Sequence, residues 1–287
     1  MSGIFLILLF SCEKNIDIKL KDAANVLVVD AAIENGKAPY VILTKSFSFF
    51  SQINPSILSG AFVHDADIFI SNGTLTHKLR EYAYPLAPGY MGWFYGIDTA
   101  NLSTSFTGQF NTQYSLEINT GGQQYNSSVS IPALSTYPDS IWLQRAPLNP
   151  DTNKRVLYIK ATDPPGLGNY IRYFTRKNSE AFLPGENSVY DDQVIDGNTY
   201  TVILPQGINK NDTPKADSNF FKRGDTVTLK FCNIERKVYK FWSTWEFAQQ
   251  SIGNPFAQPN KVLGNVSNGA LGVFCGYASW YGTKVAE

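Results

Sequence analysis

The strongest constraint on this chain is a period of two in its apolar residues, which recurs along most of its length. Residues 60–71, GAFVHDADIFIS, alternate between two faces, as a half-buried β-strand does. Asn72 and Gly73 follow at once and form the strongest short turn pattern in the sequence. Residues 75–82, LTHKLREY, are then the expected return strand. The pattern predicts antiparallel hairpins.

Further strands are predicted on both sides of this hairpin. They occupy residues 25–36, 39–50, 112–119 and 123–132. Because no helical periodicity interrupts them, residues 22–133 are expected to form one antiparallel β-sandwich. The break to the next domain is expected between residues 131 and 138.

The second half of the chain repeats the strand pattern and adds one helix, predicted near residues 235–252. Its strands are predicted at residues 139–146, 155–163, 169–178, 199–205, 224–234 and 269–282. The helix has an apolar stripe at steps of three or four, made of Val238, Phe241, Trp242, Trp245, Ala248 and Ile252. Residues 138–287 are expected to form a β-rich domain around it. The predicted fold is mainly β, with two β-sandwich-like domains of immunoglobulin or transthyretin type, the second carrying the packed helix.

Composition supports a folded body and argues against one class of partner. Hydrophobic residues make up 43% of the chain and charged residues only 17%, which is enough apolar material for a packed core. The 24 basic and 24 acidic residues cancel. A nucleic-acid-binding domain normally carries a basic excess, so we expect no nucleic-acid partner.

The first residues have the character of an export signal. Residues 4–10 are seven apolar residues, too few for the roughly 20 of a membrane-spanning helix but enough for the core of a secretory signal. Leu9, Phe10, Ser11 and Cys12 resemble a bacterial lipobox. Cleavage before Cys12 would remove residues 1–11, place lipid on Cys12 and leave residues 12–21 as a tether. The alternative is a buried N-terminal strand with an ordinary cysteine.

Several segments together resemble a known family. They are CEKNIDI at 12–18, LVVDAAI at 27–33, TDPPGLGNYIRYF at 162–174, FFKRGDTVTL at 220–229 and NPFAQPNKVLGNVSNGALGVFCGY at 254–277. In this order they resemble the Bacteroidetes outer-membrane lipoproteins of domain of unknown function 4249. The resemblance implies an outer-membrane lipoprotein of two β domains that is often encoded beside a TonB-dependent outer-membrane transporter. It supplies no reaction and no functional residues.

Residues suited to catalysis or metal binding are sparse in the sequence. His64 and His77 fall on neighbouring predicted strands, and alternation places His64 opposite its acidic neighbours, so we expect hydrogen-bonded strand residues and no metal site. Residues 190–198, YDDQVIDGN, lack the ligand alternation and closing glutamate of a calcium loop, so a solvated acidic turn is expected. Cys232 and Cys275 either pair or remain free. We expect no catalytic residues and no cofactor.

Residues 81–98 are the strongest candidate binding segment. Aromatic side chains crowd among prolines and glycines there: Tyr82, Tyr84, Tyr90, Trp93, Phe94 and Tyr95. Exposed rings on such a segment would contact a glycan, a peptide or a partner protein, whereas buried rings would fill the sandwich edge. Phe256, in residues 254–260, either docks into a partner or plugs its own domain.

Two functions from different classes follow from these features. The first is a non-enzymatic, outer-membrane-anchored protein that captures a glycan or peptide ligand or assists a TonB-dependent transporter. It would be held at the cell surface or on the periplasmic face by the lipid on Cys12. The second is a hydrolase of polysaccharide or peptide that uses two carboxylates, which would lie about 5–10 Å apart across a cleft.

Overall fold

A computed structural model describes residues 25–47, 54–210, 219–252 and 260–287, and most of the described strands belong to one large sheet. The eleven strands of this sheet, in spatial order, are β11 (Leu183–Asp191), β10 (Tyr170–Lys177), β14 (Thr226–Ile234), β15 (Leu271–Val285), β1 (Leu27–Glu34), β2 (Tyr40–Lys45), β5 (Tyr90–Ile97), β4 (Thr76–Ala87), β3 (Asp67–Ser71), β6 (Thr112–Thr120) and β7 (Gln123–Ile131). The mainly β fold class is confirmed.

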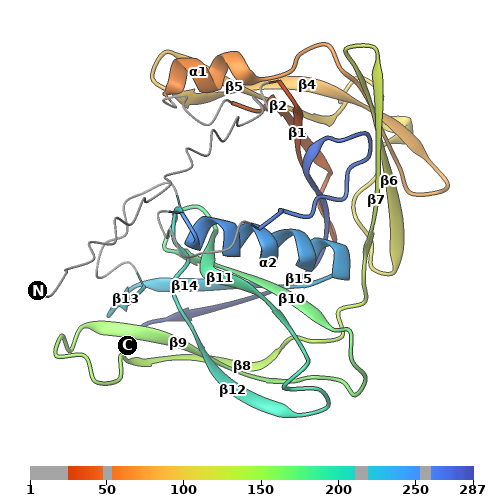
Figure 1. Ribbon diagram of the computed structural model, residues 1–287. Helices are drawn as coiled ribbons and strands as arrows, with labels where there is room; N and C mark the ends of the chain where they lie inside the picture. The colour runs from red at the N-terminus through yellow and green to blue at the C-terminus, as the bar shows by residue number, and fades with distance from the viewer. Residues whose placement is uncertain (1–24, 48–53, 211–218, 253–259) are drawn as a thin grey trace, which may run out of the picture.

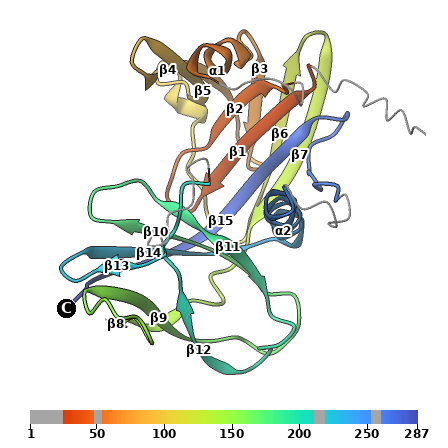
Figure 2. The ribbon, with the colours of Figure 1, turned by 60° about the vertical axis from the view of Figure 1, so that its left-hand side comes forward.

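The two halves of the chain meet where β1 pairs with β15. This pairing is parallel and runs in register from Val28 opposite Leu271 to Glu34 opposite Tyr277. In Figure 2, β15 runs beside β1 from the C-terminal half into the N-terminal half. The predicted regions 22–133 and 138–287 therefore share one sheet, and the predicted break between them falls between the end of β7 and the start of β8 (Pro138–Arg145).

A second, four-stranded sheet covers one face of the C-terminal half. It contains β8, β9 (Lys154–Thr162), β12 (Thr199–Leu204) and β13 (Phe221–Lys222). Leu157 and Ile159 of β9 are fully buried in one hydrophobic cluster with Tyr173 of β10 and Phe231 of β14. The two layers thus form a sandwich, since apolar side chains from both inner faces fill the space between them.

The helix α2 (Arg236–Gln250) packs against β10, β11 and β15. Its bounds agree with the helix predicted near residues 235–252. Val238 and Phe241 are buried, and Trp242 and Trp245 of the same stripe are half-buried against the core. Figure 1 shows α2 lying between the N-terminal strands and the C-terminal sheets.

The strand predicted over residues 60–71 is wrong in its first part. Residues Pro55–Ala61 form the helix α1, whose N-cap Asn54 accepts a hydrogen bond from the Ile57 amide at 3.0 Å. Asp65 has a positive φ of 56°, which interrupts any strand there, and β3 begins only at Asp67. A short 3-10 helix, Leu102–Thr104, lies between β5 and β6.

Three sequence expectations concern cysteines and membranes. Cys232 and Cys275 are both free and buried, and burial raises the pKa of each thiol to about 11. The predicted signal, tether and lipid-bearing Cys12 lie outside the described residues. In the described part of the chain, every helix is too short or too polar to cross a membrane.

Candidate functional site

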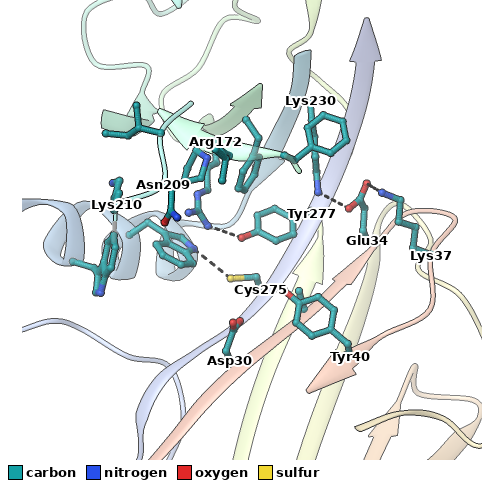
Figure 3. Close-up of a pocket in the computed structure, with 18 of the residues that line it drawn as sticks. Asp30, Glu34, Lys37, Tyr40, Arg172, Asn209, Lys210, Lys230, Cys275 and Tyr277 are labelled. Carbon is teal, nitrogen blue, oxygen red and sulfur yellow. Dashed lines mark hydrogen bonds and ion pairs between the residues drawn. The ribbon is translucent and has the colours of Figure 1, made fainter. Parts of the chain in front are cut away.

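A pocket of about 500 Å³ lies at the junction of the two halves. Strands β1 and β2 and the turn between them supply one side of it. The rest comes from β10, the start of β11, β14, β15, α2 and residues 208–210 (Figure 3). On β1, Asp30, Ala32 and Glu34 face it together because alternate residues of a strand share a face. The volume falls in the range of about 300–1,000 Å³ that small-molecule sites occupy.

Arg172 is the central cation of the pocket, although its side chain is buried. Its Nε donates to Ser188 Oγ at 3.2 Å and its Nη1 donates to the Tyr277 hydroxyl at 2.8 Å. The guanidinium carbon lies 3.4 Å from the ring centroid of Trp242 and 4.6 Å from that of Phe174. Among the described residues, no carboxylate forms an ion pair with Arg172. Aromatic faces and hydroxyl groups therefore hold this charge in place.

Asp30 and Tyr40 line the recess opposite Arg172 (Figure 3). Both keep solvent-exposed surface, yet surrounding protein desolvates their polar ends. Desolvation raises the pKa of the Asp30 carboxyl, and the charge of Arg172 acts in the opposite direction. Desolvation, followed by the nearby charge of Asp30, raises the pKa of the Tyr40 hydroxyl well above its ordinary value. This combination of access and desolvation is typical of a recessed binding site.

Glu34 occupies one end of the pocket and is fully engaged by cations and a hydroxyl. Lys230 Nζ lies 2.5 Å from its Oε2, Lys37 Nζ lies 3.0 Å from its Oε1, and the Tyr281 hydroxyl donates to Oε1. Burial alone would raise the pKa of Glu34, but the charge and hydrogen bond of Lys230, with the other donors, hold it below the ordinary value. Glu34 is thus an ionised anchor of the pocket wall.

Lys210 is the remaining cation of the pocket, and it has a carboxylate partner. Its Nζ lies 3.3 Å from Oε1 of Glu246 and 5.0 Å from the ring centroid of Trp245. Glu246 is buried on α2 and accepts hydrogen bonds from the Ser188 amide at 3.0 Å and from its hydroxyl. Asp30 and Arg172 are therefore the charged groups of the pocket that form no direct ion pair within the described residues.

The aromatic segment predicted as a binding loop is the β4–β5 hairpin, away from this pocket. Tyr82 and Phe94 stack at a centroid distance of 5.7 Å, and Tyr84 lies over Gly92, where an added Cβ would lie 2.5 Å from the ring. Trp93 contacts Phe62 and His64. Half-buried rings thus cover both faces of the hairpin.

The other two tyrosines of the hairpin differ sharply in exposure. Tyr95 is buried, and its hydroxyl accepts from the Ala66 amide and donates to the Val63 carbonyl. It supports the fold and offers no contact surface. Tyr90, beside the Pro88–Gly89 turn, is 38% exposed and is the most accessible of the predicted contact residues that the structure describes. Phe256, the last of that set, lies outside the described residues.

The two histidines are hydrogen-bonded, as expected. His64 Nδ1 lies 2.6 Å from Oε1 of Glu81. The buried His77 contacts the Thr104 hydroxyl at 2.8 Å through Nδ1 and accepts from the Asp98 amide at 2.9 Å through Nε2. Both rings therefore have structural partners of their own.

One expectation about the acidic turn is wrong. A solvated rim is expected there, but Asp192 is only 2% exposed. The turn that precedes β10 folds over its carboxylate. Gly168 and Asn169, on the turn before β10, both donate their amides to its carboxylate.

Sequence reasoning also missed Arg172 as a pocket residue. A pattern that could have indicated it lies in residues 170–174, YIRYF, where alternation places Arg172 on the same face as Tyr170 and Phe174. A cation between two aromatic positions on one face of a strand favours a cation–π arrangement. Trp242 and Trp245 were recognised only as core residues of the helical stripe.

The family model described as Domain of unknown function (DUF4249) matches residues 13–280. A search of the curated proteins found no match.

Proposed function

Since the chain belongs to the family of domain of unknown function 4249, whose description states no activity, we propose from the pocket that it is a non-enzymatic ligand-capturing protein. The observation that carries the proposal is Arg172, a buried cation that lines a pocket of about 500 Å³ without a carboxylate partner among the described residues. A guanidinium favours a carboxylate from a ligand because its planar fork matches two oxygens. The proposed ligand is a short peptide or a glycan that carries a carboxylate.

Three further features support this ligand class. Trp242, Trp245 and Phe174 give the pocket flat apolar surfaces on which a sugar ring or an apolar side chain can lie. Asp30, opposite Arg172, offers an acceptor for an ammonium or hydroxyl group of the same ligand. The ion pairs of Glu34 and Lys210 fix the walls, so less ordering is needed when the ligand binds.

In this proposal, lipid on Cys12 holds the folded protein at an outer membrane. A TonB-dependent transporter beside it takes up the captured ligand. The support for this placement is the lipobox-like sequence of residues 9–12 and the family resemblance. Tyr90 on the β4–β5 hairpin supplies exposed aromatic surface away from the pocket, so transporter contact and ligand contact would use different surfaces.

Isothermal titration with the full-length protein tests ligand capture. Peptides with a free carboxyl terminus are compared with the same peptides amidated, and acidic glycans with neutral ones. We expect the carboxylate forms to bind at least about tenfold tighter, which corresponds to about 1.4 kcal/mol. Arg172→Met should abolish the preference, and Arg172→Lys, which keeps the charge but loses the fork, should reduce it.

The matched control is Arg145→Met, because Arg145 lies on β8 outside the pocket and its side chain donates a hydrogen bond to the Asn149 carbonyl at 3.3 Å. Equal binding by wild type and a folded Arg172→Met variant would overturn the proposal, as would a panel in which no carboxylate ligand binds.

One observation favours the hydrolase as a second candidate. Asp30 and Glu34 share the pocket, and the pKa of Asp30 is raised while that of Glu34 is lowered, a division typical of acid and base pairs. Their spacing weighs against it, because four residues along a strand separate the two Cα atoms by about 13 Å. Carboxyl pairs in glycosidases lie roughly 5–10 Å apart.

Mass spectrometry of the incubated peptides and glycans separates the two candidates. Ligand capture predicts intact ligand after prolonged incubation. Hydrolysis predicts products that disappear in Asp30→Asn and in Glu34→Gln.

A further inference from the structure

Three aspartates from two turns converge at the end of the four-stranded sheet. Asp163 follows β9, and Asp192 and Asp196 lie in the turn between β11 and β12. One carboxylate oxygen of each lies within 4.8 Å of the others. Asp163 and Asp192 are each only 2% exposed, and Asp196 is half-buried.

Backbone donors position two of these carboxylates and engage one oxygen of each. Asp192 Oδ2 accepts from the Gly168 and Asn169 amides, both at 2.8 Å, and Asp196 Oδ1 accepts from the Gly166 amide at 2.6 Å. The side-chain amide of Asn169 donates to the Gly166 carbonyl at 3.1 Å and braces the same turn. The two turns are therefore fixed around the carboxylates.

Asp163 provides the second, independent observation. Its Oδ1 accepts a long hydrogen bond of 3.4 Å from the Thr136 hydroxyl, and the Gly197 amide lies close to the carboxyl group. Its Oδ2 is buried and forms no hydrogen bond of normal geometry. A buried acceptor without a donor is costly, and a buried charge more so. Within the described residues no lysine or arginine forms an ion pair with any of the three.

We propose that Asp163, Asp192 and Asp196 form a calcium site. The donor set contains only carboxylate oxygens, without histidine or cysteine, which favours a hard cation. Oxygens that bind one Ca²⁺ at about 2.3–2.6 Å lie up to about 5 Å apart, close to the span of this group. Mg²⁺, at about 2.0–2.1 Å with strict octahedral geometry, requires a tighter group. Backbone carbonyls and water complete the shell of a calcium ion.

The site ties the turn before β10 to the turn after β11. Asn169 immediately precedes β10, which carries Arg172, and Asp192 immediately follows β11, which carries Ser188. Arg172 and Ser188 are hydrogen-bonded to each other beside the pocket. The calcium site is distinct from the pocket, since none of the three aspartates lines it.

Thermal unfolding of the full-length protein tests the site. The protein is first stripped with EGTA, and CaCl₂ or MgCl₂ is then added at equal concentration. At a Ca²⁺ concentration near 100 times the dissociation constant, we expect the unfolding midpoint to rise by roughly 5–10 °C. Mg²⁺ should give a much smaller rise. An unchanged midpoint in the folded, stripped protein would overturn the proposal.

Variants separate a cation site from a merely structural cluster. In the stripped protein, Asp163→Asn should unfold at a higher temperature than wild type because it removes one of three like charges, and it should lose the Ca²⁺ increment. A structural role alone predicts a lower midpoint for this variant. Asp196→Asn, at the half-buried position, should also lose the increment if Asp163→Asn fails to fold. Asp151→Asn, on the β8–β9 turn, is the control and should keep the full increment; an equal increment in all variants would contradict the site.

Discussion

Gly276 of β15 lies so close to Ser130 of β7 that a Cβ added to Gly276 would lie 2.3 Å from the Ser130 carbonyl oxygen. The two strands are not neighbours in the large sheet, so this contact is a crossing of backbones. The crossing brings β7, the last strand in the order of the large sheet, against β15 in the interior of that sheet. The N-terminal strands thereby curl over β15, which also carries Cys275 and Tyr277 into the pocket.

Gly276→Ala should destabilise the protein by about 3 kcal/mol, at the upper end of the usual cost of overpacking. The backbone of Ser130 cannot rotate away as a side chain can. Chemical denaturation measures the change, and Gly60→Ala in α1 is the matched control. An added Cβ at Gly60 has nothing within 4 Å, so that variant should gain roughly 0.5–1 kcal/mol from helix propensity. Equal stabilities for the two variants would contradict the crossing.

Glu34→Gln should lower stability at pH 7 by about 1.5–3 kcal/mol, the range for hydrogen bonds to charged groups. The folded pKa of Glu34 lies below its ordinary value of 4.5, so its contribution is present above pH 4.5 and is lost as pH falls through the lowered pKa. The difference between wild type and variant should therefore shrink in acid.

Denaturation curves at pH 7, 4.5 and 3 measure this difference. Glu180→Gln is the control, since the Glu180–Lys177 ion pair is solvent-exposed and should contribute little at any pH. A Glu34→Gln deficit that stays constant between pH 7 and pH 3 would contradict the role assigned to Lys230.

Tyr90→Ala should weaken recovery of a TonB-dependent transporter component from native membranes several-fold, while leaving the unfolding midpoint within about 2 °C of wild type. The exposed ring contributes contact surface and little to the core. Tyr137→Ala is the control, because Tyr137 is 47% exposed but lies between β7 and β8. The transporter hypothesis fails if the wild-type protein recovers no transporter component. The hairpin is not the contact surface if the Tyr90→Ala and Tyr137→Ala variants recover equal amounts of that component.

Cys12→Ser should abolish incorporation of labelled palmitate and release the protein from the membrane fraction. Several acyl chains each contribute about 0.8 kcal/mol per buried CH₂, so loss of all of them leaves no anchor of comparable strength. Cys232→Ser is the control for thiol loss, since that buried thiol is inaccessible to acylation. Unchanged labelling in Cys12→Ser would favour the alternative of an ordinary N-terminal cysteine.

The sequence alone predicts the helices and strands whose residue pattern is local. The period of two identified β6 and β7 almost to the residue, and the apolar stripe identified α2, because each pattern reflects one buried face. It missed α1, since the Asn54–Pro55 start is short and the alternation that follows it favours a strand. The sequence also does not reveal which strands pair. Alternation indicates which face of β1 is buried, but not that β15 lies beside it.

The candidate sites were harder to predict for the same reason. Arg172 faces Asp30 only because β10 and β1 belong to one sheet and α2 closes over them. Asp163 meets Asp192 only because two turns separated in sequence fold together. The aromatic segment was visible in the sequence, but the pairing of Tyr84 with Gly92, which covers that ring, depends on hairpin register.

The parallel pairing of β1 with β15 determines when a newly made chain can finish folding. Asn35, just after β1, is hydrogen-bonded to Ser279 of β15, 244 positions later. One edge of β1 stays open until β15 has been synthesised, and such distant pairing slows folding. An open strand edge invites pairing with other chains. A ribosome that stops before Leu271 therefore releases a chain in which β1 lacks its β15 partner.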